Sequence, residues 1–373
     1  MFELLKGTVL EPEFTADGVS CYSLQGGNYL NRYYVTSEEG TRRLLNRPEV
    51  VGYEVYQCLL KTTTQMMRYF HKAGLITSAN ILSILRGALN YPLEESCYLG
   101  GIRVHDISFL SSERVFHHDE IAGLEIKYSK LAAVPDSTLL IGDIIATGDT
   151  LVHCLRYVTE YYRKHGAKLR NIVVFTIGGN TGIEIMENLT REIQEFWPDF
   201  EGFIAVYYEG IFNTYKDRGV SGINIVDVDF YWEDGIIAPE YRKETLSEIN
   251  TLFEKCIIYD GGARRYEIYD HIREVLEFWE GIRERAGQID FTALVDEKLG
   301  TRADVSLEEW IACQHYENLS AELNRELYQQ EQEYRGKVKE VSLLNIAEQR
   351  IREFSTALKK YMLYDEKTGG EKQ

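Results

Sequence analysis

The sequence of 373 residues has few cysteines, no long apolar run and a minority of basic residues. Its six cysteines are scattered and form no CxxC pair, which argues against a disulfide framework or a zinc site of that spacing. No stretch approaches the ~18 apolar residues of a membrane helix, and the N-terminus lacks a basic and apolar leader, so we expect a cytoplasmic protein without membrane contact. With 41 Lys and Arg against 59 Asp and Glu, the net charge of -18 disfavours duplex nucleic acid as a ligand.

The remaining composition is that of a globular chain, with 44% hydrophobic and 27% charged residues. Its length allows two domains, and the pattern changes twice along it. Residues 1–45 mix short apolar pieces with turn formers, which predicts strands and loops at an edge. Residues 46–241 alternate between apolar segments of strand length and segments of helical spacing. Residues 242–373 are polar and rich in Glu, Arg, Leu and Ala, which predicts a mostly helical extension that docks on the first part, on a second copy in a homodimer, or on a partner.

Within the central part, apolar segments of strand length alternate with segments of helical spacing. This alternation is typical of βαβ units, so we predict an α/β fold whose parallel sheet is covered by helices on both faces. The predicted strands are 81–85, 138–142, 171–178 and 202–208, and the predicted helices are 48–71, 151–165 and 182–196.

The most informative stretch is LLIGDIIATGDTL at 139–151. It reads as a buried strand, an acidic residue at the strand end, and a glycine turn that opens a helix. Unpaired backbone N–H groups and the positive end of the helix dipole converge at such a turn, which suits a phosphate. Asp143, placed just before the turn, suits the hydroxyls of a sugar whose phosphate lies in the loop. Neither GxxxxGK[ST] nor GxGxxG is present here, so we predict a sugar phosphate site of another kind.

The strand, the acidic residue and ATGxT together resemble the phosphoribosyl pyrophosphate motif of type I phosphoribosyltransferases. ILRGAL at 84–89 resembles the pyrophosphate loop of that family, and the stretches at 125–151 and 173–186 make the chain most similar to the uracil phosphoribosyltransferase branch. The resemblance covers roughly residues 44–241. It implies a phosphoribosyltransferase-like parallel sheet and a magnesium-dependent transfer of ribose 5-phosphate to a nitrogenous base, or the reverse reaction on a nucleotide.

The same resemblance implies roles for individual residues. Asp143 and Arg86 would be catalytic, Asp143 at the ribose hydroxyls and Arg86 at the pyrophosphate. Mg²⁺ would be bound mainly through the substrate pyrophosphate, with no direct protein ligand. Residues 100–125 fall where the family has a mobile loop over the site. The other implied residues are Ala146, Thr147, Gly148, Asp149, Thr150 and Gly87 for the phosphates, Asp229, Tyr231 and Trp232 for the nucleobase-like acceptor, and Arg103 and Arg114 on the mobile loop.

Two alternatives stay open. The 139–151 stretch could be an ordinary strand-to-helix turn with a Thr cap. The chain could also be a regulator or assembly subunit that keeps the fold and binds a nucleotide or phosphoribosyl pyrophosphate without turnover. Gly142 motivates this second alternative, because most of the family has a further acidic residue directly before the one that corresponds to Asp143.

Overall fold

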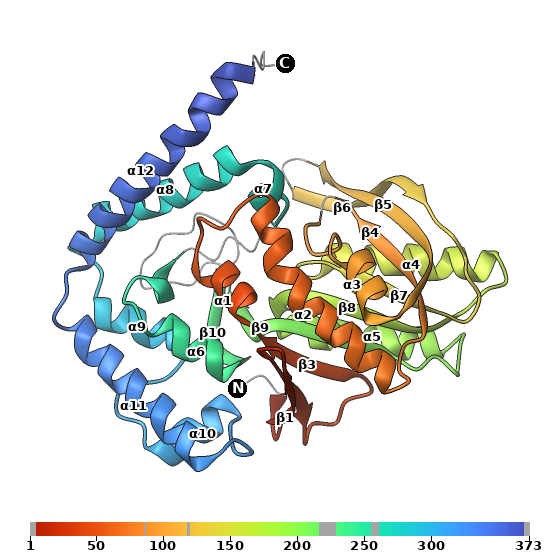
Figure 1. The fold of residues 1–373 in the computed structure, drawn as a ribbon, viewed down its shortest axis with the longest axis horizontal. Coiled ribbons are helices and arrows are strands. Elements are labelled where there is room, and N and C mark those ends of the chain that lie inside the picture. The colour runs from red at the N-terminus through yellow and green to blue at the C-terminus, as the bar shows by residue number, and fades with distance from the viewer. Residues whose placement is uncertain (1–4, 86, 118–119, 216–228, 255–260, 369–373) are drawn as a thin grey trace.

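The computed structural model describes residues 5–85, 87–117, 120–215, 229–254 and 261–368. Its centre is a ten-stranded sheet with the order β1-β2-β3-β9-β8-β7-β4-β5-β6, and β10 pairs with the far end of β9 (Figure 1). The strands are β1 (Val9–Ala16), β2 (Val19–Gln25), β3 (Arg32–Ser37), β4 (Ser78–Ile84), β5 (Arg103–His117), β6 (Glu120–Lys130), β7 (Ser137–Gly142), β8 (Leu169–Gly179), β9 (Phe203–Tyr215) and β10 (Asp229–Ile237).

The middle of the sheet is parallel. β3, β9, β8, β7, β4 and β5 lie side by side, each parallel to the next. Every residue of β7 is buried, as continuous apolar strands require when both faces of a sheet are covered. β1, β2, β6 and β10 are antiparallel to their neighbours. The predicted α/β class is therefore confirmed, with a parallel centre and antiparallel edges.

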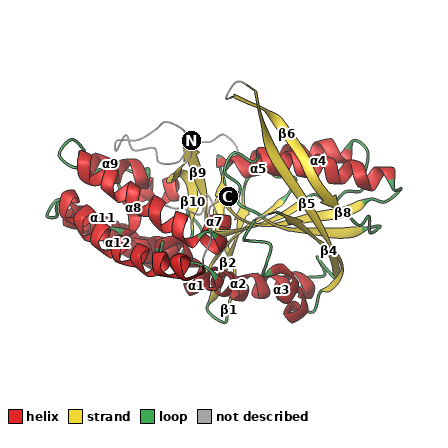
Figure 2. Cartoon of the chain, turned by 90° about the horizontal axis from the view of Figure 1, so that it is seen from above, coloured by secondary structure: helices red, strands yellow, loops and turns green. Residues whose placement is uncertain are grey.

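Helices cover both faces of the sheet. Figure 2 shows α2 and α3 on one side and α4 and α5 on the other. The predicted helices at 48–71, 151–165 and 182–196 are confirmed as α2, α4 and α5, although α2 begins at Tyr53. The bounds are α1 (Glu39–Asn46), α2 (Tyr53–Lys72), α3 (Leu93–Gly100), α4 (Asp149–Lys164) and α5 (Thr181–Gln194).

The N-terminal segment is part of the same sheet. As predicted, it forms strands at an edge, and β3 attaches them through a parallel ladder in which Val35 is the partner of Tyr207 on β9. Both side chains are buried. The N-terminal strands therefore extend the central sheet and share its core.

The segment 100–125, predicted as a mobile loop, forms most of the antiparallel hairpin of β5 and β6. Arg103 begins β5 and lies opposite Ser78, the first residue of β4. Because the candidate phosphate loop follows the carboxyl ends of the parallel strands, Arg103 lies at the opposite edge of the sheet. The prediction that Arg103 covers the site is therefore wrong. Arg114 lies within β5, and its side chain is outside the described part.

The chain after β10 is helical wherever it is described, as predicted. α12 packs along α8 and projects beyond the rest of the molecule (Figure 1). No helix in the described ranges has the length and apolar character needed to cross a bilayer. The elements are α6 (Pro239–Thr245), the 3-10 helix η2 (Thr251–Phe253), α7 (Gly261–Tyr266), α8 (Ile268–Arg285), α9 (Phe291–Leu299), α10 (Leu307–Gln314), α11 (Ala321–Val338) and α12 (Leu343–Thr368).

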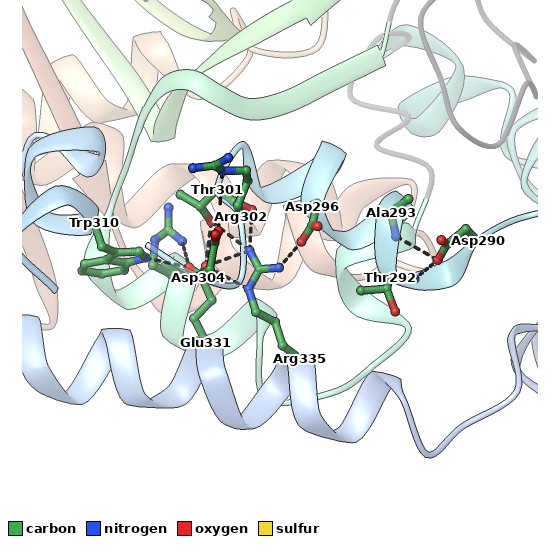
Figure 3. A network of polar contacts seen from close by, with 11 residues as sticks. Asp290, Thr292, Ala293, Asp296, Thr301, Arg302, Asp304, Trp310, Glu331 and Arg335 are labelled. Atoms are coloured by element: carbon green, nitrogen blue, oxygen red, sulfur yellow. Dashed lines mark hydrogen bonds and ion pairs between the residues drawn. The ribbon is translucent and has the colours of Figure 1, made fainter. Parts of the chain in front are cut away.

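Buried charges join α6, α10 and α11 around Glu331, whose side chain is fully buried (Figure 3). Its Oε2 accepts hydrogen bonds from Arg242 Nη1 at 2.9 Å and from Trp310 Nε1 at 2.9 Å. Its Oε1 accepts from Thr301 Oγ1 at 2.7 Å and from Arg335 Nη2 at 3.1 Å. One carboxylate thus compensates two buried guanidinium groups, so its removal leaves both cations without their central partner.

We predict that Glu331→Ala lowers the free energy of unfolding by roughly 3–5 kcal/mol, because it leaves the buried Arg242 without its carboxylate partner, whereas Arg335 keeps Asp296. The matched control is Glu326→Ala on the same helix, whose exposed pair with Lys243 is worth no more than about 1 kcal/mol. Urea unfolding followed by tryptophan fluorescence measures both. Equal small losses in the two variants would contradict the role assigned to Glu331.

Candidate functional site

The chain that leaves β7 stays hydrogen-bonded to β8 beyond the end of the strand. Asp143 N–H donates to Phe175 O at 3.1 Å, and Ile145 N–H donates to Ile177 O at 3.1 Å. Gly179 N–H returns a bond to Ile145 O at 2.9 Å. These bonds fix the backbone of residues 143–145, so the following turn starts from a rigid position.

The turn itself depends on Gly148, the N-cap residue of α4. Its φ of 79° lies in the left-handed region that favours glycine. A Cβ at this position would also lie 2.1 Å from Cδ1 of Ile185 on α5. The backbone conformation therefore favours glycine here, and a side chain would in addition displace Cδ1 of Ile185.

The first turn of α4 presents backbone donors. The N–H groups of Asp149, Thr150 and Leu151 donate to no described residue, as the first residues of a helix do when no side chain caps them. The hydroxyl of Thr147 donates to Oδ2 of Asp149 at 2.9 Å, and Asp149 is exposed. The predicted residues 146–150 are thus gathered at a helix N-terminus whose dipole favours an anion.

The second predicted loop lies directly against the first. A Cβ on Gly142 would lie 2.2 Å from Leu89 O and 2.7 Å from Asn90 N, so the two backbones touch where only glycine fits. A Cβ on Gly87 would lie 3.2 Å from Oδ1 of Asp143. The loop is folded back on itself by a hydrogen bond from Gly87 N–H to Ile84 O at 2.9 Å. Residues 84–89 and 142–150, far apart in sequence, therefore meet at the carboxyl ends of β4 and β7.

Asp143 is the acidic group at this meeting point. Its Oδ1 accepts a hydrogen bond from Ile144 N–H at 2.9 Å, which favours the charged form. Desolvation by the surrounding protein is the larger effect and raises the pKa of Asp143 to about 7. A carboxyl group with this pKa exchanges its proton near neutral pH, which is unusual for Asp and typical of a functional position.

The residues predicted for the acceptor have other partners. Lys298 Nζ lies 4.3 Å from the ring centroid of Tyr231, and the guanidinium of Arg242 lies 4.7 Å from that of Trp232. Tyr231 is 3% exposed and Trp232 is 6% exposed. The prediction that these rings stack on a base is therefore wrong, because the C-terminal helices cover them.

Two further predicted residues have no described side chain. Arg86 lies outside the described residues altogether, and Asp229 begins β10 with its side chain undescribed. Their predicted roles at the pyrophosphate and at the base stay predictions.

The sequence analysis missed an aromatic group beside the second loop. Tyr91 follows Asn90 directly, and its ring contacts Tyr266 on α7 at a centroid distance of 5.7 Å. Tyr266 belongs to a Gly-Gly-Ala-Arg-Arg-Tyr segment that reads as a simple connector. The available signal was the position of Tyr91, two residues after the ILRGAL stretch.

We predict that Asp143→Asn raises stability at pH 8 more than at pH 4. The folded state raises the pKa of Asp143, so its protonated form favours folding, and this stability is lost as pH rises from about 4 to about 7. The amide stays neutral at both pH values. We therefore expect the free energy of unfolding of Asp143→Asn to exceed that of the native chain by roughly 1–3 kcal/mol at pH 8 and to differ little from it at pH 4. Asp304→Asn, on a 76% exposed side chain, is the control. Thermal unfolding at the two pH values measures this difference in stability. A variant Asp143→Asn that is less stable than the native chain at pH 8 would contradict the claim that the folded state desolvates the charged carboxylate.

No family model matches the chain, and no curated protein matches it. Among solved structures, it is similar to a protein of Aquifex aeolicus at 19% identity and a TM-score of 0.32, covering 45% of this chain and 81% of that one. It is also similar to a hypoxanthine phosphoribosyltransferase of Staphylococcus aureus at 16% identity and a TM-score of 0.26, covering 35% and 67%. The hypoxanthine-guanine phosphoribosyl transferase of L. donovani matches at 16% identity and a TM-score of 0.27, covering 34% and 69%. Scores this low assign neither a family nor an activity, and the similarity to the uracil branch stays a prediction from the sequence.

Proposed function

We propose that the protein is a magnesium-dependent phosphoribosyltransferase that transfers ribose 5-phosphate from phosphoribosyl pyrophosphate to a nitrogenous base, or runs the reverse reaction on a nucleotide. One observation carries the proposal. The loop at 84–89 and the loop at 142–150 meet backbone to backbone, with the carboxyl group of Asp143 beside Gly87 and the uncapped N-terminus of α4 following in the same loop. This arrangement supports a ligand with two anionic ends and a hydroxylated middle.

The 5-phosphate would occupy the turn before α4. The free N–H groups of residues 149–151 and the helix dipole supply donors and positive potential. Thr147 and Thr150 add hydroxyl groups. The hydroxyl of Thr147, which donates a hydrogen bond to Asp149, would donate to the phosphate instead. Asp149 would then turn outward, since a carboxylate beside a phosphate dianion is repelled.

The ribose hydroxyls would face Asp143, and the pyrophosphate would lie along the Gly87 loop. In the reaction, the bond between ribose C1 and a pyrophosphate oxygen breaks, and its electron pair leaves with the pyrophosphate. Positive charge grows on the sugar ring, and the carboxylate of Asp143 would stabilise it. A lone pair on the base nitrogen then forms the C1–N bond, and a proton carried by that nitrogen passes to the departing pyrophosphate or to water. The glycine at 87 would let the leaving group approach the backbone closely.

The site residues fit a magnesium ion that arrives with its substrate. The described residues contain no cluster of three His, Cys, Asp or Glu side chains, and Mg²⁺ commonly binds through one carboxylate and several phosphate oxygens. Asp143 is the available carboxylate. When bound, the ion would neutralise charge on the leaving pyrophosphate.

A regulator that binds the same ligand without turnover is the second candidate. Gly142 favours it, because the contact with Leu89 leaves no room for the additional carboxylate that most of the resembled family carries there. A catalyst at this site would have to work with Asp143 as its single strand-end carboxylate.

We predict that the full chain with Mg²⁺ consumes phosphoribosyl pyrophosphate in the presence of a suitable base. Asp143→Asn abolishes turnover, and Thr147→Ala weakens binding of ribose 5-phosphate about tenfold because it removes one charge-assisted hydrogen bond. Thr159→Ala, a buried Thr at the far end of the same helix, is the control for general effects. Pyrophosphate release across a panel of bases measures turnover, and calorimetry measures binding.

Binding of ribose 5-phosphate without turnover for any base or nucleotide would support the regulator. A chain that neither binds ribose 5-phosphate nor turns over would contradict both candidates.

A further inference from the structure

Two tyrosines lie against Arg265, and a third tyrosine contacts one of them. The guanidinium of Arg265 lies 5.6 Å from the ring centroid of Tyr53 and 5.4 Å from that of Tyr266. The ring of Tyr266 in turn meets that of Tyr91 edge to face, at 5.7 Å and 67°. We call Tyr53, Tyr91, Arg265 and Tyr266 the aromatic platform. It combines residues of α2, of the loop after β4 and of α7.

The platform is open to solvent in spite of these contacts. Tyr53 is 61% exposed, Tyr91 41% and Tyr266 45%. Arg265 forms no ion pair with any described carboxylate, and its Nε is buried without a hydrogen-bond partner. In a protein with a net charge of -18, exposed tyrosine rings beside a guanidinium form a local positive and aromatic surface that suits an anionic ring.

The backbone connects the platform to the candidate site. Asn90, the residue before Tyr91, is one of the two whose backbones press on Gly142, and Gly142 precedes Asp143. α7 contacts α2, and Figure 1 shows it beside the N-terminal end of α2. The platform is therefore joined to the 84–89 loop of the site through Tyr91, which directly follows Asn90.

Hydrogen bonds of the C-terminal extension fix the two platform residues that lie on α7, Arg265 and Tyr266. Arg264, which is buried, donates from Nε to Val50 O at 2.6 Å, and Gly52 N–H donates to Arg264 O at 2.9 Å. His271 on α8 shares a hydrogen bond of 2.7 Å with Pro48 O. These bonds fix α7 against the connection between α1 and α2. The position of Arg265 and Tyr266 is thus built into the fold.

From these observations we infer that the aromatic platform binds the acceptor, and that the acceptor is a planar heteroaromatic ring carrying a carboxylate. The inference rests on the proposed function for its place in the reaction. The exposed rings of Tyr91 and Tyr266 provide stacking surfaces for the ligand ring, whereas Tyr53 already stacks on Tyr56. The guanidinium of Arg265 matches a carboxylate in charge and in its forked geometry. The C-terminal extension thereby supplies part of the acceptor site, which Tyr231 and Trp232 cannot do.

Two matched ligand pairs test the inference on the full chain: nicotinate against nicotinamide, and orotate against uracil. Calorimetry is run with and without ribose 5-phosphate. We expect the carboxylated member of at least one pair to bind about tenfold more tightly or better than its neutral partner. Arg265→Ala removes this difference. Tyr266→Ala and Tyr91→Ala weaken both members about 10- to 100-fold, and Tyr266→Phe keeps the binding.

Tyr98→Ala is the matched control, because Tyr98 is 82% exposed on α3 and outside the platform. Affinity for ribose 5-phosphate stays unchanged in all platform variants, which also shows that they are folded. If neither pair binds the native chain, or if Arg265→Ala leaves the carboxylate preference intact, the inference is overturned. If the heteroaromatic ligands bind as expected but ribose 5-phosphate does not, the inferred ligand of the platform is supported and the proposed transferase function is contradicted.

Discussion

The contact between Gly142 and the backbone at Leu89 and Asn90 is the constraint on which the candidate site depends. Adjacent parallel strands bring the ends of β4 and β7 to the same edge, but strand pairing alone leaves the two following loops apart. A missing side chain at position 142 lets the loops touch. Gly87 is then held near Asp143, and the N-terminus of α4 follows on a backbone already fixed to β8. The site is thus assembled by close approach of main chains more than by side-chain contacts.

The site lowers the stability of the fold, and other parts of the fold compensate for this loss. Asp143 is desolvated without a described cation beside it, and the helix that follows leaves its first N–H groups free. The continuous core of the sheet and its covering helices supply the compensating stability. The C-terminal helices have a different role. They bury Tyr231 and Trp232, and α7, which Arg264 anchors to the connection between α1 and α2, brings Tyr266 against Tyr91.

Much of the central fold could be predicted because it is encoded locally. The strands at 138–142 and 171–178 are mostly apolar and fully buried, and the turn at Gly148 follows from residues next to each other. Two predictions failed for different reasons. The mobile loop at 100–125 was implied by the resemblance, whereas these residues pair as an antiparallel edge hairpin. Trp232 is buried against Tyr241 and Arg242 of α6, contacts that the strand pattern alone does not show. The contact of Gly142 with Leu89 could not be predicted from the sequence either. A glycine before an acidic residue shows that a second carboxylate is missing, but it does not show which backbone lies against the glycine.

A crystal structure of the full chain with ribose 5-phosphate tests the central claim most directly. The account predicts that the phosphate lies within hydrogen-bond distance of the N–H groups of residues 149–151, with the ribose hydroxyls at Asp143 and the anomeric carbon toward Gly87. Density for the ligand elsewhere, or a turn at 146–150 closed by protein atoms while Gly142 and Leu89 remain in contact, would contradict it.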